Sequence, residues 1–320
     1  MINALKRVAK RLPYPLLMRT YYAWYFARKL TRFERTRRRL GLPRLSSVDL
    51  SRHKKSDTLF ILGSGPSINQ ISSDRWEAIA RHDSVGVNMW LYHRFVPTFY
   101  VVESASYSGP REKVCRELVR LSHLRGQDYA NTIKIITDLY ESDRQYVFDL
   151  APEFRENLFA AYNVPLVARD HEEFERGLAY LQQKGLFQLQ SRMGWLLKYG
   201  LSLSLLLTFG LRMGYKRVVL CGIDMVSQEY FYQDPAIYPE NRGLCLVPRA
   251  AKHAADQKVA WMLPQSEVVL AMQRLLLQPA GVELFVETPA SILHGPLALP
   301  PASVLEPDRT TPLGLACGNR

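Results

Sequence analysis

Residues 59–70 read L-F-I-L-G-S-G-P-S-I-N-Q, an apolar strand that runs directly into a glycine-rich turn. A buried strand ending in Gly63, Gly65 and Pro66 lets backbone N–H groups approach a phosphate closely, and Ser67 is placed to cap a following helix. The turn lacks the third glycine of the dinucleotide fingerprint and the lysine of a P-loop. It therefore predicts a nucleotide site without hydride chemistry or ATP hydrolysis; a plain strand-to-helix turn is the alternative.

Apolar strands alternate with helical patterns beyond this turn. We expect strands near 59–62, 84–87, 98–102, 132–136, 217–221 and 282–286, and helices near 74–81, 113–124 and 202–213. This alternation is typical of an α/β, Rossmann-like fold, in which helices cover both faces of a parallel or mostly parallel twisted sheet. Ligands of such sheets bind at the carboxyl ends of the strands, where Gly63, Asn88, Glu103 and Asp224 fall.

Residues 56–295 are expected to form one catalytic domain. The pattern is unclear from 141 to 172, and it vanishes between 225 and 253, a long stretch with several tyrosines and prolines. Long insertions at the ligand end of a strand are often lids over active sites, although a surface excursion is the alternative for 225–253. Residues 296–320 are rich in proline and are expected to be a loose tail.

Basic residues are concentrated at the start of the chain. Residues 1–45 contain thirteen Lys or Arg and one acid, Glu34, so this segment carries the whole net charge of +12. Aromatic and aliphatic residues between 16 and 26 interleave with these charges, which predicts an amphipathic arm, residues 1–50, on an anionic membrane surface. The arm has neither the ~20 apolar residues of a spanning helix nor the features of a signal peptide. We therefore expect a cytoplasmic protein on the inner face of the cytoplasmic membrane; a solvated basic helix is the alternative.

Other partners and ligands have weaker support. Arg37-Arg38-Arg39 suits nucleic acid, but the basic residues do not continue into the body, so no nucleic-acid partner is expected. Four scattered cysteines favour neither a disulfide framework nor a zinc site. The body contains no Asp-x-Asp pair for Mg²⁺ or Mn²⁺, so no metal site is expected. Whether the chain forms a homo-oligomer stays open.

Several stretches, taken in order, resemble the bacterial sialyltransferases of glycosyltransferase family 42. They are G-S-G-P-S at 63–67, Asn88 at the end of the next strand, G-Y-K-R-V-V-L-C-G-I-D at 214–224 and T-P-A-S-I-L at 288–293. The match covers residues 59–293 in islands. The resemblance implies a single-domain, GT-A-like Rossmann fold with a lid, a CMP-activated sialic acid as donor, no cofactor or metal, and inversion at the anomeric centre.

The resemblance also implies roles for individual residues. The glycine turn and Asn88 would hold the ribose and phosphate of the nucleotide, and Ser202 falls where the family binds the carboxylate of the sugar. Tyr232 falls on a tyrosine whose hydroxyl stabilises the departing phosphate. His253 falls on the general base of the family.

Three departures from the family pattern leave the donor sugar open. Ser64 replaces an Asn inside the glycine turn, and either Glu103 or Ser104 replaces an Asn after the third strand. A second tyrosine of the family is Val226 here, for which Tyr230 is the candidate substitute.

The chemistry of transfer from a CMP-sugar agrees with this set of residues. Negative charge develops on the departing phosphate, which needs hydroxyl or amide donors, and the acceptor hydroxyl needs a base. A histidine with its ordinary pKa of ~6.5 is mostly neutral at cytosolic pH and suits the role of base.

The first hypothesis is therefore a metal-independent inverting glycosyltransferase. It would move sialic acid, Kdo or a related acidic sugar from CMP to a glycan or glycolipid precursor of lipooligosaccharide or capsule. A similar Gly-Ser-Gly-Pro-Ser turn occurs in pterin diphosphokinase-like proteins, which makes a pyrophosphoryl transferase the second hypothesis, with Glu103 and Asp224 as the carboxylates for Mg²⁺. The third is a non-catalytic, membrane-associated nucleotide-binding protein.

Overall fold

A seven-stranded parallel sheet forms the centre of the molecule. The computed structural model describes residues 16, 24, 26–103, 112–139, 145–187, 194–226, 229–242 and 262–304. The strand order is β5-β4-β3-β2-β1-β8-β9, and every neighbouring pair is parallel. The strands are β1 (Thr58–Leu62), β2 (Asp83–Val87), β3 (Phe99–Val102), β4 (Ile133–Ile136), β5 (Leu158–Ala160), β8 (Arg217–Cys221) and β9 (Glu283–Val286). The expected α/β, Rossmann-like fold is confirmed.

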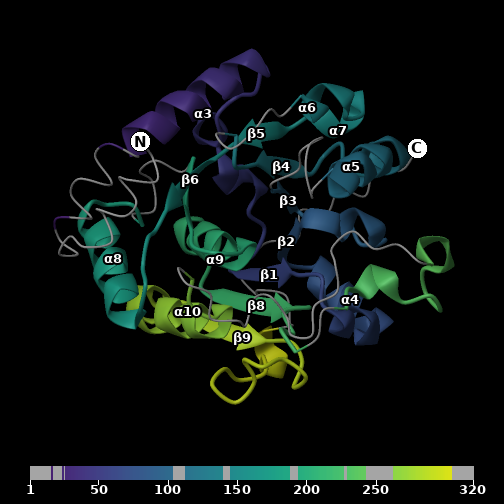
Figure 1. Ribbon diagram of the computed structural model, residues 1–320. Helices are drawn as coiled ribbons and strands as arrows, with labels where there is room; N and C mark the ends of the chain where they lie inside the picture. Colours follow the sequence, from purple (N-terminus) through teal and green to yellow (C-terminus); the bar gives the residue numbers. More distant parts are fainter. Residues whose placement is uncertain are drawn as a thin grey trace.

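Helices cover both faces of this sheet. Figure 1 shows α9 (Ser202–Arg212) and α10 (Gln265–Met272) on one side of the central strands, and α4 (Ser73–Ala80) and α5 (Glu112–Arg125) on the other. All five residues of β1 are buried, as its unbroken apolar run requires of a strand covered on both faces. The helices expected near 74–81, 113–124 and 202–213 agree with α4, α5 and α9 to within one residue.

The order of the strands reverses between β1 and β8. From β1 the chain adds β2, β3, β4 and β5 on one side, and it returns to add β8 and β9 on the other side. Right-handed crossovers in opposite directions put their helices on opposite faces. The connections therefore diverge above the carboxyl ends of β1 and β8, the place where ligands bind in open α/β sheets.

The unclear stretch from 141 to 172 holds several short elements. They are α6 (Tyr146–Asp149), α7 (Pro152–Arg155), β5, β6 (Tyr162–Pro165) and the start of α8 (His171–Gln183). An additional strand, β7 (Trp195–Lys198), was not predicted and pairs with β6 in a separate two-stranded sheet. β5, β6 and β7 together contain one β-branched residue, Val164, whereas the equally short β3 and β4 contain two and three, so the missed strands carry a weaker strand pattern.

The arm expected at 1–50 does not remain separate from the body over residues 26–50. The rings of Phe26 and Phe33 pack edge-on against Tyr162 at 5.3 and 5.4 Å. The Ala160 N–H donates to the carbonyl of Pro43 at 2.8 Å. The apolar face of α3 (Ala27–Arg39) and the leucines that follow it join the core, so residues 26–50 of the predicted arm pack on the body.

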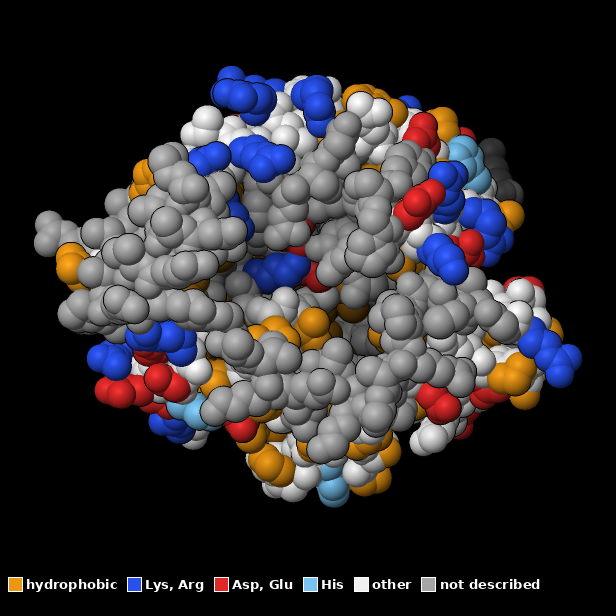
Figure 2. Space-filling view, in the orientation of Figure 1, with side chains coloured by type: hydrophobic (Ala, Val, Ile, Leu, Met, Phe, Trp, Pro, Cys, Tyr) orange, Lys and Arg blue, Asp and Glu red, His pale blue; other side chains and the backbone are white. Residues whose placement is uncertain are grey.

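The outer face of α3 stays basic. Arg28, Arg32, Arg35, Arg38 and Arg39 are exposed, and Figure 2 shows Lys and Arg side chains gathered over the top of the molecule, where α3 lies. Among the described helices, none combines the length and apolar character needed to cross a membrane.

The predicted tail also begins later than residue 296. Leu297 and Val304 are buried, and the Val286 N–H of β9 donates to the carbonyl of Ala298 at 3.1 Å. The first part of the predicted tail, 296–304, therefore packs against the edge of the sheet. Residues 305–320 lie outside the described part of the chain.

Candidate functional site

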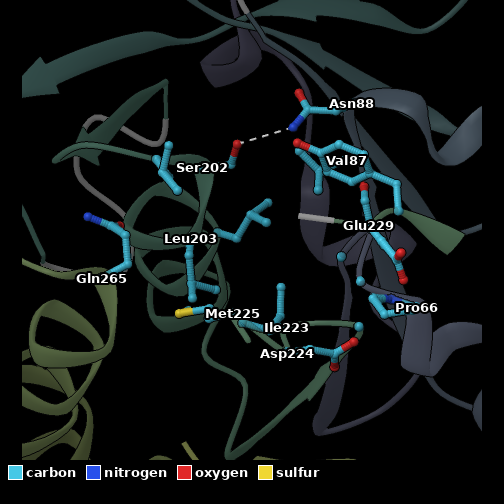
Figure 3. A pocket seen from close by; sticks show the side chains of 17 residues that line it. Pro66, Val87, Asn88, Ser202, Leu203, Ile223, Asp224, Met225, Glu229 and Gln265 are labelled. Carbon is cyan, nitrogen blue, oxygen red and sulfur yellow. Dashed lines mark hydrogen bonds between the residues drawn. The ribbon is translucent and has the colours of Figure 1, made fainter. Parts of the chain in front are cut away.

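A cavity of about 210 Å³ opens where the connections after β1 and β8 diverge. Figure 3 shows side chains from both connections, from the end of β2 and from the first turn of α9 around it. Its walls include eight of the candidate residues: Gly63, Ser64, Gly65, Pro66, Asn88, Ser202, Asp224 and Tyr230. The structure therefore brings together residues from five separate segments of the chain.

The glycine turn is held by the connection after β8. The N–H of Gly63 donates to the carbonyl of Cys221 and the N–H of Gly65 to the carbonyl of Gly222, both at 2.8 Å. Pro66 has no N–H, so Ser64 is the residue of 63–66 whose N–H makes no hydrogen bond within the described chain. Several amides of this turn were predicted to bind a phosphate. Of these, the amide of Ser64 remains available, together with the Ser64 hydroxyl.

Close packing explains why this turn contains glycine. A Cβ at Gly63 would lie 2.3 Å from Ile223 Cδ1 and 2.6 Å from the carbonyl oxygen of Gly222. A Cβ at Gly65 would lie 2.4 Å from Asp224 Oδ2. All three contacts are shorter than van der Waals distances, so the close approach of the connection after β8 requires glycine at both positions.

Asp224 and Ser67 bind each other. The Ser67 N–H donates to Asp224 Oδ2 at 2.9 Å, and its hydroxyl donates to Oδ1 at 2.5 Å. Ser67 does not cap the following helix as predicted; η4 (Pro66–Gln70) begins after Gly65 and has no side-chain cap. Both side chains are buried, so this pair fixes the turn after β1 to the connection after β8.

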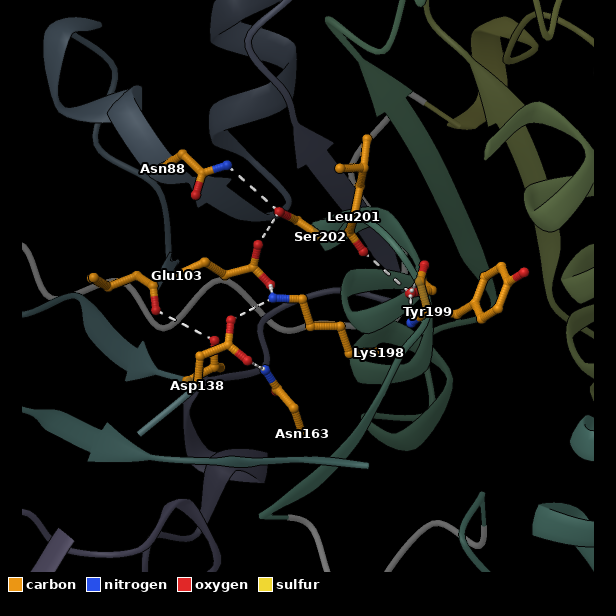
Figure 4. Close-up of polar contacts among 11 residues, drawn as sticks. Asn88, Glu103, Asp138, Asn163, Lys198, Tyr199, Leu201 and Ser202 are labelled. Carbon is orange, nitrogen blue, oxygen red and sulfur yellow. Dashed lines mark hydrogen bonds and ion pairs between the residues drawn. The ribbon is translucent and has the colours of Figure 1, made fainter. Parts of the chain in front are cut away.

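Ser202 connects the cavity to a buried polar network, which Figure 4 shows. Its hydroxyl donates to a carboxylate oxygen of Glu103 and lies 3.5 Å from the amide nitrogen of Asn88. Asn88 follows β2, Glu103 follows β3 and Ser202 begins α9. All three residues therefore lie at the carboxyl edge of the sheet. Ser202 thus already has an anionic acceptor in the protein.

Lys198 lies at the centre of this network. Its Nζ is 3.2 Å from Glu103 Oε1 and also contacts a carboxylate oxygen of Asp138. The Asn163 amide donates to the other oxygen of Asp138 at 2.5 Å. Burial acts to lower the pKa of Lys198, but the charges of Glu103 and Asp138 outweigh it and raise that pKa above its ordinary value of 10.5. Lys198 is therefore charged at neutral pH.

Backbone strain is also concentrated at this edge. Asn88, Asp138 and Met225 adopt positive φ angles of 55°, 57° and 59°, and they follow β2, β4 and β8 respectively. Such angles are unfavourable for residues with a Cβ and often occur at functional sites. The strain supports the placement of a functional site at the carboxyl edge.

The two candidate tyrosines have different surroundings. Tyr230 lines the cavity, and burial raises the pKa of its hydroxyl, so it keeps its proton at neutral pH. The ring of Tyr232 is only 2% exposed and stacks between Tyr230 and Tyr92, with centroid distances of 5.3 and 4.9 Å. Tyr232 does not line the cavity, so Tyr230 is the better placed donor.

The described part of the predicted lid is anchored to the glycine turn. The Phe231 N–H donates to the carbonyl of Ser64 at 3.0 Å, and the Asn69 amide donates to the carbonyl of Phe231 at 2.9 Å. Phe231 and Tyr232 are buried. This part of the segment 225–253 forms a wall of the cavity.

Two candidate residues, Ser104 and His253, lie outside the described residues. Four further residues in or beside the site were not predicted from the sequence: Lys198, Asp138, Glu229 and Gln265. The sequence pattern could have indicated two of them as polar residues at the ends of strands. Lys198 follows three apolar residues in W-L-L-K, and Asp138 lies two residues after the end of β4.

No protein-family model matches this chain, and a search of curated proteins finds no significant match. Within the described ranges, no group of three or more His, Cys, Asp or Glu side chains is arranged to hold a metal ion. The structure therefore defines an α/β protein with a cavity at the point where its strand order reverses.

Proposed function

We propose that this chain is a metal-independent inverting glycosyltransferase that uses a CMP-activated acidic sugar, such as sialic acid or Kdo. The observation that carries the proposal is the cavity between the β1 and β8 connections, which gathers the glycine turn, Asn88, Ser202 and Tyr230 in one place. The acceptor would be a glycan or glycolipid precursor. The resemblance to family 42 sialyltransferases suggests the donor, and the hydroxyl and amide groups in the cavity support it as possible hydrogen-bond donors to a phosphate.

The donor phosphate would bind near Ser64. The Ser64 amide and hydroxyl and the protonated Tyr230 hydroxyl line the cavity, and each can donate a hydrogen bond to an oxyanion. Donors that already point at the departing phosphate stabilise the charge that develops there during transfer. The Asn88 amide, held next to Ser202, can bind the ribose.

The acidic sugar would bind beside Ser202. Its hydroxyl donates to Glu103 in the unliganded protein, and a sugar carboxylate could take the place of Glu103 as acceptor. Lys198 would then balance Glu103, with which it already forms an ion pair at 3.2 Å. The base that receives the proton of the acceptor hydroxyl is assigned to His253 from the resemblance alone.

The two other hypotheses have less support. Pyrophosphoryl transfer needs carboxylates for Mg²⁺, and the two that were proposed, Glu103 and Asp224, have protein partners in Lys198 and Ser67. A protein that binds nucleotide without catalysis would use the same cavity and would bind CMP without releasing it from a CMP-sugar.

Release of CMP from CMP-sialic acid or CMP-Kdo in the presence of EDTA tests the proposal. We expect turnover by the wild type that EDTA does not inhibit, and loss of turnover in His253→Ala by a factor of roughly 10²–10⁴, typical for removal of a general base. Uridine diphosphate sugars and ATP are the control substrates. Turnover of ATP with Mg²⁺, or binding of CMP without release, would move the assignment to the second or third hypothesis.

The two stacked tyrosines offer a matched pair of variants. Tyr230→Phe is expected to lower kcat by roughly 10²-fold, because it removes a donor to the departing phosphate while the ring packing is kept. Tyr232→Phe, in which the altered ring does not line the cavity, is expected to keep kcat within about threefold. Steady-state CMP release measures both. A larger loss of kcat in Tyr232→Phe than in Tyr230→Phe would show that the functional hydroxyl is that of Tyr232, as the resemblance implies, and not that of Tyr230, which lines the cavity.

The exposed basic face of α3 would bring the enzyme to lipid-linked acceptors on the inner face of the cytoplasmic membrane. Replacing Arg28, Arg32 and Arg35 with Gln is expected to weaken binding to vesicles containing anionic lipid by at least roughly 10-fold, since each basic residue near such a surface contributes about 1 kcal/mol. Sedimentation with vesicles measures this loss. Neutral vesicles and the variant Arg116→Gln, on α5, are the controls, and equal binding by all proteins would contradict membrane docking through α3.

A further inference from the structure

A buried amide at one end of the cavity makes no hydrogen bond with the described protein. Gln265 is the first residue of α10, its side chain is 0% exposed, and neither its Nε2 nor its Oε1 has a hydrogen-bond partner. Gln265 is also among the residues that line the cavity. Buried amides in native proteins are almost always paired, so an unpaired amide in the wall of a cavity indicates a group that a ligand satisfies.

The surroundings hold this amide in place. The Leu263 N–H, two residues before Gln265, donates to the Tyr199 hydroxyl at 2.9 Å, which fixes the start of α10 to the segment between β7 and α9. A Cβ on Gly200 would lie 2.6 Å from Gln265 Nε2, and Gly200 has a φ of +71°. The chain therefore keeps space for the amide at a position where a larger residue would be both strained and too close.

Gln265 stands apart from the glycine turn. In Figure 3, Gln265 and Asn88 lie on opposite sides of the view, with Ser202 and Leu203 between them. The lining of the cavity also includes apolar residues such as Leu201 and Leu206. If the phosphate of a ligand binds near Ser64, a different part of the same ligand would therefore lie near Gln265.

We propose that Gln265 is a specificity-determining residue that pairs with a ligand group carrying an adjacent hydrogen-bond donor and acceptor. A side-chain amide offers one C=O acceptor and one NH₂ donor in a plane, so it pairs with another amide or with an amide-like edge. In a CMP-sugar this chemistry comes from the N-acyl group of the sugar or from the pyrimidine edge of cytosine. The inference rests on the proposed function, because it assumes that a CMP-sugar occupies the cavity.

The pairing predicts selectivity for the ligand group that lies near Gln265. A site that buries a hydrogen-bonding group rejects analogues that lack the matching group, because the protein group is then left unpaired. Sugars or bases without an adjacent donor and acceptor are therefore expected to bind less tightly at the Gln265 end.

Two measurements on Gln265→Met test the inference. Calorimetric binding of CMP, CMP-N-acetylneuraminate and CMP-Kdo, without acceptor, is expected to show an affinity loss of roughly 10- to 100-fold for at least one ligand. Loss already with CMP assigns the pyrimidine edge, and loss only with CMP-N-acetylneuraminate assigns the N-acyl group. Gln265→Glu keeps the shape but lacks the donor, and we expect the same ligand to be affected.

The melting temperature of the unliganded variant provides the second measurement. Because the amide has no described partner, Gln265→Met is expected to melt at the wild-type temperature or above it, as is the control Gln278→Met at an exposed position after α10. A lower melting temperature for Gln265→Met alone would overturn the inference, and so would unchanged affinity for all three ligands. Failure of the wild type to bind any of them would overturn the proposed function and the ligand assignment together.

Discussion

Replacing Lys198 with Met is expected to lower the free energy of unfolding by about 3–5 kcal/mol, the usual effect of removing one member of a buried ion pair. The side chains of Lys198, Glu103 and Asp138 are 17%, 7% and 0% exposed. Without the ammonium group, two carboxylates remain in a site that water hardly reaches. Chemical denaturation of wild type and variant measures the difference.

The control for this variant is Lys216→Met. Lys216 also pairs with a carboxylate, that of Asp57, at 2.9 Å, but its side chain is 73% exposed. An exposed pair contributes about 0–1 kcal/mol, so the control is expected to lose no more than that. A similar loss of unfolding free energy in both variants would show that burial does not increase the contribution of Lys198 to stability.

The contribution of Lys198 also depends on pH. Its pKa is raised on folding, so the stabilisation is fully present below its ordinary value of 10.5 and is lost as the pH rises through the higher value of the folded protein. The difference in unfolding free energy between wild type and Lys198→Met is therefore expected to be largest near neutral pH and to shrink above pH 10.5. A difference that grows in alkali would contradict this assignment.

Gly63→Ala is expected to lower the free energy of unfolding by about 3 kcal/mol, at the upper end of the usual effect of overpacking. The added methyl group would lie 2.6 Å from the carbonyl oxygen of Gly222, and this is a backbone atom that a rotamer change cannot move. The turn after β1 and the connection after β8 would have to separate, which would also open the cavity. Denaturant unfolding and CMP binding together report both effects.

Gly194→Ala is the matched control. Its added Cβ would come no closer than 3.6 Å to another atom, an ordinary contact, so we expect a change within about 1 kcal/mol. Equal destabilisation by the two substitutions would show that loss of glycine flexibility, and not the close approach of the two connections, governs Gly63.

The sequence was sufficient to locate the central strands and the edge that carries the site. β1 and β8 contain the unbroken apolar runs 59–62 and 218–221, which end in glycine turns, and such runs are typical of strands covered on both faces. β5, β6 and β7 were missed because they contain one β-branched residue among them, Val164, whereas the equally short β3 and β4, which were predicted, contain two and three. The packing of residues 26–50 on the body was missed because an amphipathic basic helix suits a membrane surface and a protein surface equally well.

The sequence by itself determined the α/β class, the glycine turn and the polar residues that end the strands, because apolar periodicity and turn chemistry are local properties. Only the tertiary structure decided how those polar residues pair. It placed Asp224 on Ser67, Lys198 between Glu103 and Asp138, and Tyr230 rather than Tyr232 in the cavity wall. Lys198 and Asp138 are 60 positions apart in the chain, and their contact depends on the strand order and on the length of each connection. Such pairing is a property of the assembled sheet edge, where donors and acceptors from separate segments first meet.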